Sequence, residues 1–322
     1  HCFAVALRLR SLHSRPMSYA PLPENVNGSA EAKQIMQENE WDKGLVIFGG
    51  LVSESTVKVA TAVELLKQQD GFPFKDPKWV DLSFDEKSLS TAKDGKQSMG
   101  VNSEMWLTLS GGKGYMPAIS IDGKMMCDAY TIVSYFWDTY PDKSLSSAEQ
   151  EMVKKLLDWN SEHSERLFEA LKHWGWCAMN GAKKNYMHLG YGKKDLAWEK
   201  EVVKVVDTFF TFLEDTLQKK KAGGGLNGFF VGNKMTLADC ALLNWPGSFK
   251  LVLGMNIPQR YPLTWENFEM LKKTAPAGSN DHYTTFPIFA MIVGMLNSRN
   301  RGTGLCCLCG KGFYIDNPVY WS

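Results

Sequence analysis

One segment, KGYMPAISIDGKMMCDAYTIVSYF at residues 113 to 136, constrains the fold more than any other part of the chain. In this segment a proline precedes a short β-prone run, and Asp122-Gly123 is typical of a hairpin turn. A second run from Lys124 leads into residues 129 to 140, which have the apolar spacing of a helix and end before Pro141. The segment therefore predicts two antiparallel strands joined by a tight turn and followed by a helix.

The residues before this segment predict a parallel pair of strands. GLVIFGG, at 44 to 50, is a short apolar run that ends in two glycines, as a buried strand does. A helix follows from the candidate N-cap Ser53, with one apolar face made of Val57, Ala60, Val63 and Leu66. KWVDLSF, at 78 to 84, predicts the next strand. With the hairpin, these elements predict a small mixed sheet with helices on both faces.

After Pro141 the pattern changes to helices only. Two long segments, 146 to 174 and 196 to 221, have a helical repeat of apolar residues. A third helix is predicted within FFVGNKMTLADCALLNW, where Thr236 and Asp239 have the spacing of a capping box. Further amphipathic segments follow near 261 to 273 and 286 to 298.

The fold class that follows is α+β, with a mixed-sheet domain at residues 44–141 and an all-helical domain at residues 142–298. Residues 1–43 are expected to be a flexible or processed segment, and residues 299–322 a tail. The first 16 residues are basic and lack acids, which fits a transit peptide or translated untranslated sequence ahead of Met17. The tail cysteines have no second ligand pair near them, so no metal site is expected.

The composition argues against two classes of partner. The net charge is +1 and no basic stretch occurs, so we expect no nucleic acid. No apolar run reaches the roughly 18 residues that a membrane-spanning helix needs, so we expect no membrane insertion. The chain has 7 cysteines without a disulfide-like spacing, which favours a reducing compartment and a cytoplasmic location.

These motifs together resemble the glutathione transferase superfamily over about residues 44 to 275. Residues 113 to 136 are similar to the family's glutathione-binding segment, and residues 229 to 245 to its capping-box helix. The first strand and helix look most like the tyrosine-type alpha, mu, pi and sigma classes. The resemblance implies a thioredoxin-like first domain, reduced glutathione as cosubstrate, detoxification of small apolar electrophiles, and a homodimer.

The resemblance also assigns residues to the peptide backbone and glycyl end of glutathione. Pro117 matches a cis-proline of the family, so Met116 would offer its backbone to the cysteinyl part of glutathione, unless Pro117 is a plain turn proline. Trp106 and Lys113 are the candidates for holding the glycyl carboxylate. Tyr115 lies at a position that contacts the tripeptide or covers the strand.

At the glutamyl end the sequence departs from the family pattern. Asp128-Ala129 replaces a Gln/Glu-Ser pair at the start of the helix, so the hydroxyl that would help to hold the glutamyl carboxylate is lost. Asp128 would either repel that carboxylate or pair with the glutamyl ammonium group. Weaker glutathione binding is the expected consequence.

The residues at the positions that activate the thiol also differ from the family pattern. Ile47 stands at the tyrosine position and Leu51 near the position used by the serine and cysteine classes, and neither donates a hydrogen bond. Ser53 and Ser55 are the nearby hydroxyls, which either cap the helix or help to activate the thiol. Two hypotheses follow: an enzyme that conjugates or isomerises small apolar electrophiles with glutathione, or a non-catalytic protein with a structural or binding role.

Overall fold

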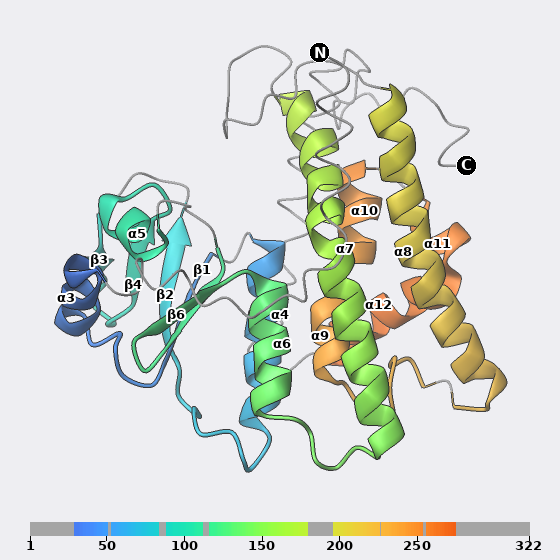
Figure 1. Cartoon of the computed structure of the whole chain (residues 1–322), viewed down its shortest axis with the longest axis horizontal. Helices are drawn as coiled ribbons and strands as arrows, with labels where there is room; N and C mark the ends of the chain where they lie inside the picture. The colour runs from blue at the N-terminus through green and yellow to red at the C-terminus, as the bar shows by residue number, and fades with distance from the viewer. Residues whose placement is uncertain are drawn as a thin grey trace.

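The computed structural model describes residues 29–50, 53–83, 88–111, 116–179, 196–225, 227–253 and 256–274. The first part of the described chain alternates strands and helices (Figure 1). Its elements are α3 (Ala30–Glu38), β1 (Leu45–Gly49), α4 (Glu54–Lys67), β2 (Lys78–Ser83), β3 (Ser90–Thr91), β4 (Gln97–Gly100), α5 (Glu104–Leu109), β5 (Ala118–Ile121), β6 (Lys124–Cys127) and α6 (Ala129–Thr139).

Helices alone make up the second part of the described chain. They are α7 (Ser147–Met179), α8 (Leu196–Ala222), α9 (Leu237–Leu242), α10 (Trp245–Leu253), α11 (Ile257–Arg260) and α12 (Pro262–Thr274). The predicted capping box forms at the start of α9, where the Asp239 carboxylate accepts hydrogen bonds from the Thr236 amide and hydroxyl, both at 2.8 Å. The α+β class, with a mixed sheet first and helices after it, is therefore confirmed.

The six-stranded sheet has the order β3-β4-β2-β1-β5-β6. Strands β1 and β2 are parallel and β5 and β6 are antiparallel, as the sequence predicted, and β5 lies next to β1. Strands β3 and β4 were not predicted. They are two and four residues long and mostly polar, so they lack the apolar alternation by which a strand is recognised.

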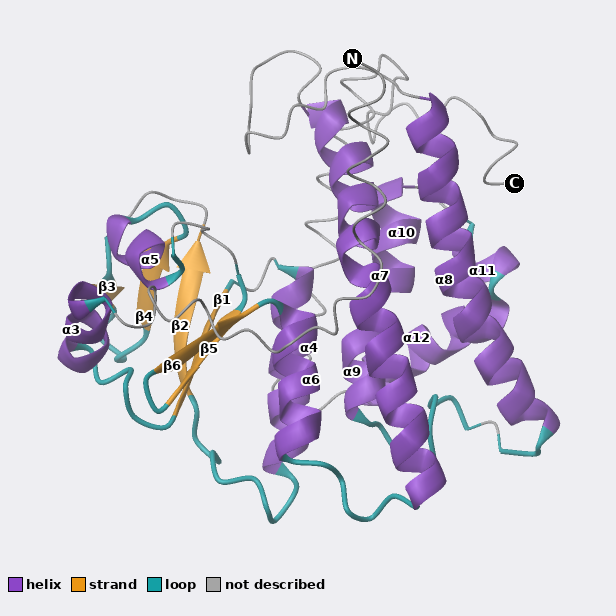
Figure 2. Cartoon of the chain, viewed as in Figure 1, coloured by secondary structure: helices purple, strands orange, loops and turns teal. Residues whose placement is uncertain are grey.

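The two faces of the sheet are covered by different helices. Figure 2 shows α3 and α5 on one side, and α4 and α6 on the other, between the sheet and the long helices α7 and α8. Alternate residues of β1 serve these two faces: Val46 and Phe48 pack with one core cluster, and Leu45 and Ile47 with the other. The second cluster continues into the helical part, where it includes Phe209 of α8.

Two glycines at the end of β1 allow a close approach of the backbone. A Cβ atom on Gly49 would lie 2.5 Å from the Thr56 side chain at the start of α4. A Cβ atom on Gly50 would lie 2.2 Å from the backbone oxygen of Leu82 in β2. Neither contact is sterically possible. The two glycines therefore allow the end of β1 to lie close to both β2 and the N-terminal end of α4.

Helix α3 corrects the prediction that residues 1–43 are flexible, as far as residues 29–43 are concerned. Ala32 and Met36 lie on one face of α3 and are buried, and Trp41 after the helix is fully buried. The Trp41 indole N–H donates to Gln97 Oε1 of β4 at 2.9 Å. Few residues of this polar run are apolar and take part in the packing, which is why the sequence suggested a flexible segment. Residues 1–28, the amphipathic segment 286–298 and the tail 299–322 lie outside the described residues.

Candidate glutathione site

Three chain segments meet at one edge of the sheet: the end of β1, the start of β5 and the end of β6. The strand register places Phe48 of β1 opposite Ala118 of β5, and Ala118 opposite Cys127 of β6. Helices α4 and α6 therefore both begin at this edge, with the Met116-Pro117 segment between them. The first N–H groups of a helix have no partner within the helix and carry partial positive charge, so this edge is suited to an anionic ligand.

Pro117 lies at the centre of this edge. The Met116-Pro117 peptide bond is cis, as the family resemblance implied. Pro117 is buried, and its carbonyl accepts a hydrogen bond from the Asp128 amide at 3.3 Å. The Met116 side chain lies against Gly50, with its sulfur 3.3 Å from the place of a Cβ atom there. Within the described part of the chain, no hydrogen bond involves the Met116 backbone.

Asp128 has an unusual backbone conformation where α6 begins. Its φ of 74° and ψ of 125° place a non-glycine residue at positive φ, which commonly costs about 1–3 kcal/mol and persists only where the surrounding structure imposes it. The Asp128 carbonyl accepts from the Ile132 amide at 2.9 Å, but its side chain does not cap α6. Ala129, next in the chain, is buried in the core.

Ser53 is the N-cap of α4. Its hydroxyl oxygen accepts a hydrogen bond from the Thr56 amide at 3.3 Å, and its own amide donates to the Gly50 carbonyl at 2.9 Å. The capping alternative is therefore confirmed for Ser53. Ser55 is half-buried in the first turn of the same helix. Activation of a thiol by Ser53 or Ser55 stays a prediction.

The residue at the tyrosine position offers no polar group to the site. Ile47 is 1% exposed and belongs to the core on the α4 side of the sheet. Leu51, Lys113 and Tyr115 lie outside the described residues, so their predicted roles stay predictions.

Trp106 corrects the prediction that it holds the glycyl carboxylate. Its side chain is fully buried, and its ring centre lies 5.3 Å from that of Phe48. The indole N–H is also buried and has no hydrogen-bond partner among the residues that the structure describes. Trp106 and Leu109 lie three residues apart on the face of α5 that packs on the sheet, so a ligand at the surface cannot contact the indole.

Asp81 is a titratable group near this edge. It lies opposite Gly49 in the register of β1 and β2. Its neighbours Val80 and Leu82 pack under α3 and α5, so Asp81 lies on the α4 side of the sheet. Burial raises the pKa of the Asp81 carboxyl above its usual value, because an ionised carboxylate is poorly solvated there.

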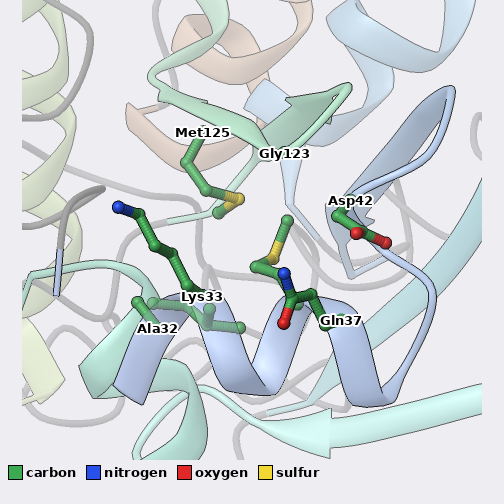
Figure 3. Close-up of a pocket in the computed structure, with 8 residues that line it drawn as sticks. Ala32, Lys33, Gln37, Asp42, Gly123 and Met125 are labelled. Carbon is green, nitrogen blue, oxygen red and sulfur yellow. The ribbon is translucent and has the colours of Figure 1, made fainter. Parts of the chain in front are cut away.

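A separate cavity of about 70 Å³ lies between α3 and the β5–β6 hairpin (Figure 3). In Figure 3 the Lys33 and Met125 side chains extend beside each other at this cavity. Its lining consists of Ala32, Lys33, Met36, Gln37, Asp42, Leu109, Gly123 and Met125. Pockets for small-molecule ligands are usually about 300–1,000 Å³, so this cavity is too small for a tripeptide.

Comparison with known proteins supports the fold described above, a mixed sheet followed by helices. Residues 183–275 match the family model for the C-terminal domain of glutathione S-transferases. Ure2p in complex with glutathione is a structural match with 16% identity and a TM-score of 0.52, over 75% of this chain and 94% of that one. The nitrogen regulation fragment of the yeast prion protein Ure2p matches with 17% identity and a TM-score of 0.52, over 74% and 96%.

A delta-class glutathione transferase of Nilaparvata lugens also matches, with 16% identity and a TM-score of 0.50, over 77% of this chain and 99% of that one. A search of curated protein sequences finds no significant match. The chain therefore has the glutathione transferase fold, with a thioredoxin-like sheet domain and a helical part. Nearness to the alpha, mu, pi and sigma classes stays a prediction. In the part of the chain that the structure describes, no helix is both long and apolar enough to span a membrane.

Proposed function

We propose that this chain binds glutathione at the sheet edge where α4 and α6 begin. The observation that carries the proposal is the backbone of Asp128, a non-glycine residue with φ of 74° at the N-cap of α6. Strained residues of this kind cluster at ligand-binding sites, because a ligand contact needs the geometry that the strain provides. The fold shared with glutathione-bound Ure2p supports the choice of ligand.

Each part of glutathione has a chemical partner in this proposal. The glutamyl carboxylate lies at the N-terminal end of α6, where the amides of the first turn attract an anion. The Asp128 carboxylate pairs with the glutamyl ammonium group, because the two carry opposite charges. The Met116 backbone pairs with the cysteinyl backbone, as an added strand would. Lys113 is proposed for the glycyl carboxylate, and Tyr115 for a contact with the tripeptide.

The proposed reaction is conjugation or isomerisation of a small apolar electrophile. The bound thiol gives its proton to water, and the thiolate sulfur attacks the electrophile, whose leaving group takes the electrons of the broken bond. The positive end of α4 favours the thiolate, with Ser53 and Ser55 close by. We propose a cytoplasmic homodimer that acts in detoxification.

A non-catalytic binding role is the second candidate. Ile47 is buried where tyrosine-type enzymes place their activating hydroxyl, and the Ser53 hydroxyl oxygen caps α4 by accepting from the Thr56 amide. Glutathione binding without turnover is what these two observations favour. Both candidates share the same glutathione site, and they differ only in whether the bound thiol reacts.

Calorimetric titration with reduced glutathione tests the site, and turnover of an aryl halide separates the two roles. Asp128→Asn should weaken binding by about 10- to 100-fold, because a hydrogen bond to a charged group is commonly worth about 1.5–3 kcal/mol. Asp122→Asn is a matched control: Asp122 also has positive φ, but lies at the opposite end of the β5–β6 hairpin. Equal glutathione affinity in wild type, Asp128→Asn and Asp122→Asn would contradict the proposed site, and so would a complete lack of binding by wild type.

A further inference from the structure

A half-buried carboxylate lies near the end of β2, beside the candidate glutathione site. It belongs to Asp81, which pairs with Gly49 in the register of β1 and β2. Among the residues that the structure describes, none donates a hydrogen bond to this carboxylate or forms an ion pair with it. Burial without such a partner is what raises the pKa of Asp81.

Contacts of the two glycines at the end of β1 place Asp81 close to that site. Neighbouring strands lie about 4.7–4.9 Å apart, so Asp81 is next to Gly49, on the α4 side of the sheet. Thr56, in the first turn of α4, lies over the same glycine, with its Oγ1 2.9 Å from the place of a Cβ atom there. At Gly50 the place of a Cβ atom is 3.3 Å from the Met116 sulfur. Asp81 is therefore one strand away from both the first turn of α4 and the Met116 segment.

The proposed reaction needs a group that takes the proton of the bound thiol. Ile47 is apolar and buried, and the Ser53 hydroxyl oxygen accepts a hydrogen bond from the Thr56 amide. A carboxylate is a better proton acceptor when its pKa is raised toward the working pH, and burial shifts the pKa of Asp81 in that direction. A buried charge without a partner also lowers fold stability, which is a cost that proteins commonly retain at functional sites.

We propose that Asp81 is the general base for glutathione bound at this edge: its carboxylate accepts the thiol proton as the sulfur attacks the electrophile. The inference rests on the proposed function. The S–H bond breaks, its electron pair forms the S–C bond, and the leaving group departs with the electrons of its own bond. The proton is held on an Asp81 carboxylate oxygen and passes from there to water. Proton transfer accompanies the attack, because a full thiolate beside a carboxylate would be disfavoured.

Neighbouring charges do not set the pKa of Asp81. The adjacent strands β1 and β4 carry no titratable side chain. The described titratable groups on β2, α4 and α6 are Lys78, Lys58, Glu64, Lys67, Tyr130, Tyr135 and Asp138. None of them contributes to the raised pKa of Asp81, which is caused by burial. A loss of turnover in acid would therefore report the protonation of Asp81 itself.

Turnover of an aryl halide with reduced glutathione, measured across a pH series, tests the proposal. The full chain is compared with Asp81→Asn, which keeps the shape of the side chain and removes the carboxylate. Asp76→Asn is the matched control, because Asp76 is exposed and precedes the first residue of β2, at the opposite end of that strand. Calorimetry reports the glutathione affinity of each protein. Asp81→Asn is expected to fold, because it removes a buried charge.

Wild-type kcat/KM should be level between about pH 6 and pH 8, because an ionised carboxylate is available throughout that range. Asp81→Asn should lower kcat/KM at about pH 7 by roughly 100-fold or more, since general bases contribute about 10²–10⁴-fold. Its remaining rate should rise about tenfold per pH unit below about pH 8.5, because it depends on thiolate that forms without a base. Glutathione affinity should change little, and Asp76→Asn should behave as wild type does.

Several results overturn the Asp81 proposal alone. One is an Asp81→Asn rate within a few-fold of wild type, and another is a loss of kcat/KM matched by an equal loss of glutathione affinity. A wild-type protein that binds glutathione without turnover, or whose rate rises tenfold per pH unit throughout, overturns it too, and neither result needs a variant. Failure of wild type to bind glutathione overturns the proposed function, and the Asp81 proposal with it.

Discussion

Replacing Met36 with alanine tests whether α3 is part of the folded core. Met36 is 4% exposed, packs in the same cluster as Phe48 and Trp106, and lines the cavity of about 70 Å³. Methionine-to-alanine substitutions in cores cost about 2–5 kcal/mol, and the cost rises with the volume of the space left behind. Because the new space would join an existing cavity, the upper half of that range is expected, about 3.5–5 kcal/mol.

Urea unfolding, followed by tryptophan fluorescence, measures this change, since Trp41 and Trp106 belong to the same cluster. Gln34→Ala is the control: it lies exposed on α3, so its effect should stay within about 0.5 kcal/mol. If the urea midpoints of wild type and Met36→Ala coincide, α3 is not packed on the sheet, and residues 29–43 are a flexible segment after all.

Three further predictions concern the site and its support. Thr236→Ala should lower stability by about 0.5–2 kcal/mol through loss of the capping box, with coincident urea midpoints as the contrary result. Gly50→Ala should weaken glutathione binding in calorimetry, because its Cβ would meet the Leu82 oxygen at 2.2 Å, while Gly71→Ala, with nothing within 4 Å, should not. Asp81→Asn should raise the melting temperature at neutral pH. Burial raises the pKa of Asp81 in the folded protein above its ordinary value of 3.8. Asp81 therefore does not destabilise the folded protein below pH 3.8, where it is protonated, but does so increasingly as pH rises. The gain in melting temperature from Asp81→Asn should accordingly vanish in acid. A gain that persists in acid would contradict the assigned cause.

The elements that the sequence predicted are those with a local signal of their own. Strands β1 and β2 are recognisable as short strand-like runs, the β5–β6 hairpin from Asp122-Gly123, and α9 from its capping box. The cis bond before Pro117 was expected from the family resemblance and is present. In each case the residues that carry the signal are neighbours in the chain.

The parts that were not predicted depend on contacts between distant residues. Helix α3 is fixed by Met36 and by the bond of Trp41 to Gln97, 56 residues away. Trp106 was assigned to the glycyl carboxylate from the family resemblance, and the sequence does not show that its side chain packs against Phe48 in the core.

Glutathione binding at the edge where α4 and α6 begin is the central claim, and amide NMR during titration with reduced glutathione tests it most directly. The claim predicts saturable shifts at the amides of Met116, Asp128 and Ala129, and in the first turn of α4, with little change around the α3 cavity. Absence of shifts at saturating glutathione, or shifts confined to Lys33, Gln37 and the rest of that cavity, would contradict it.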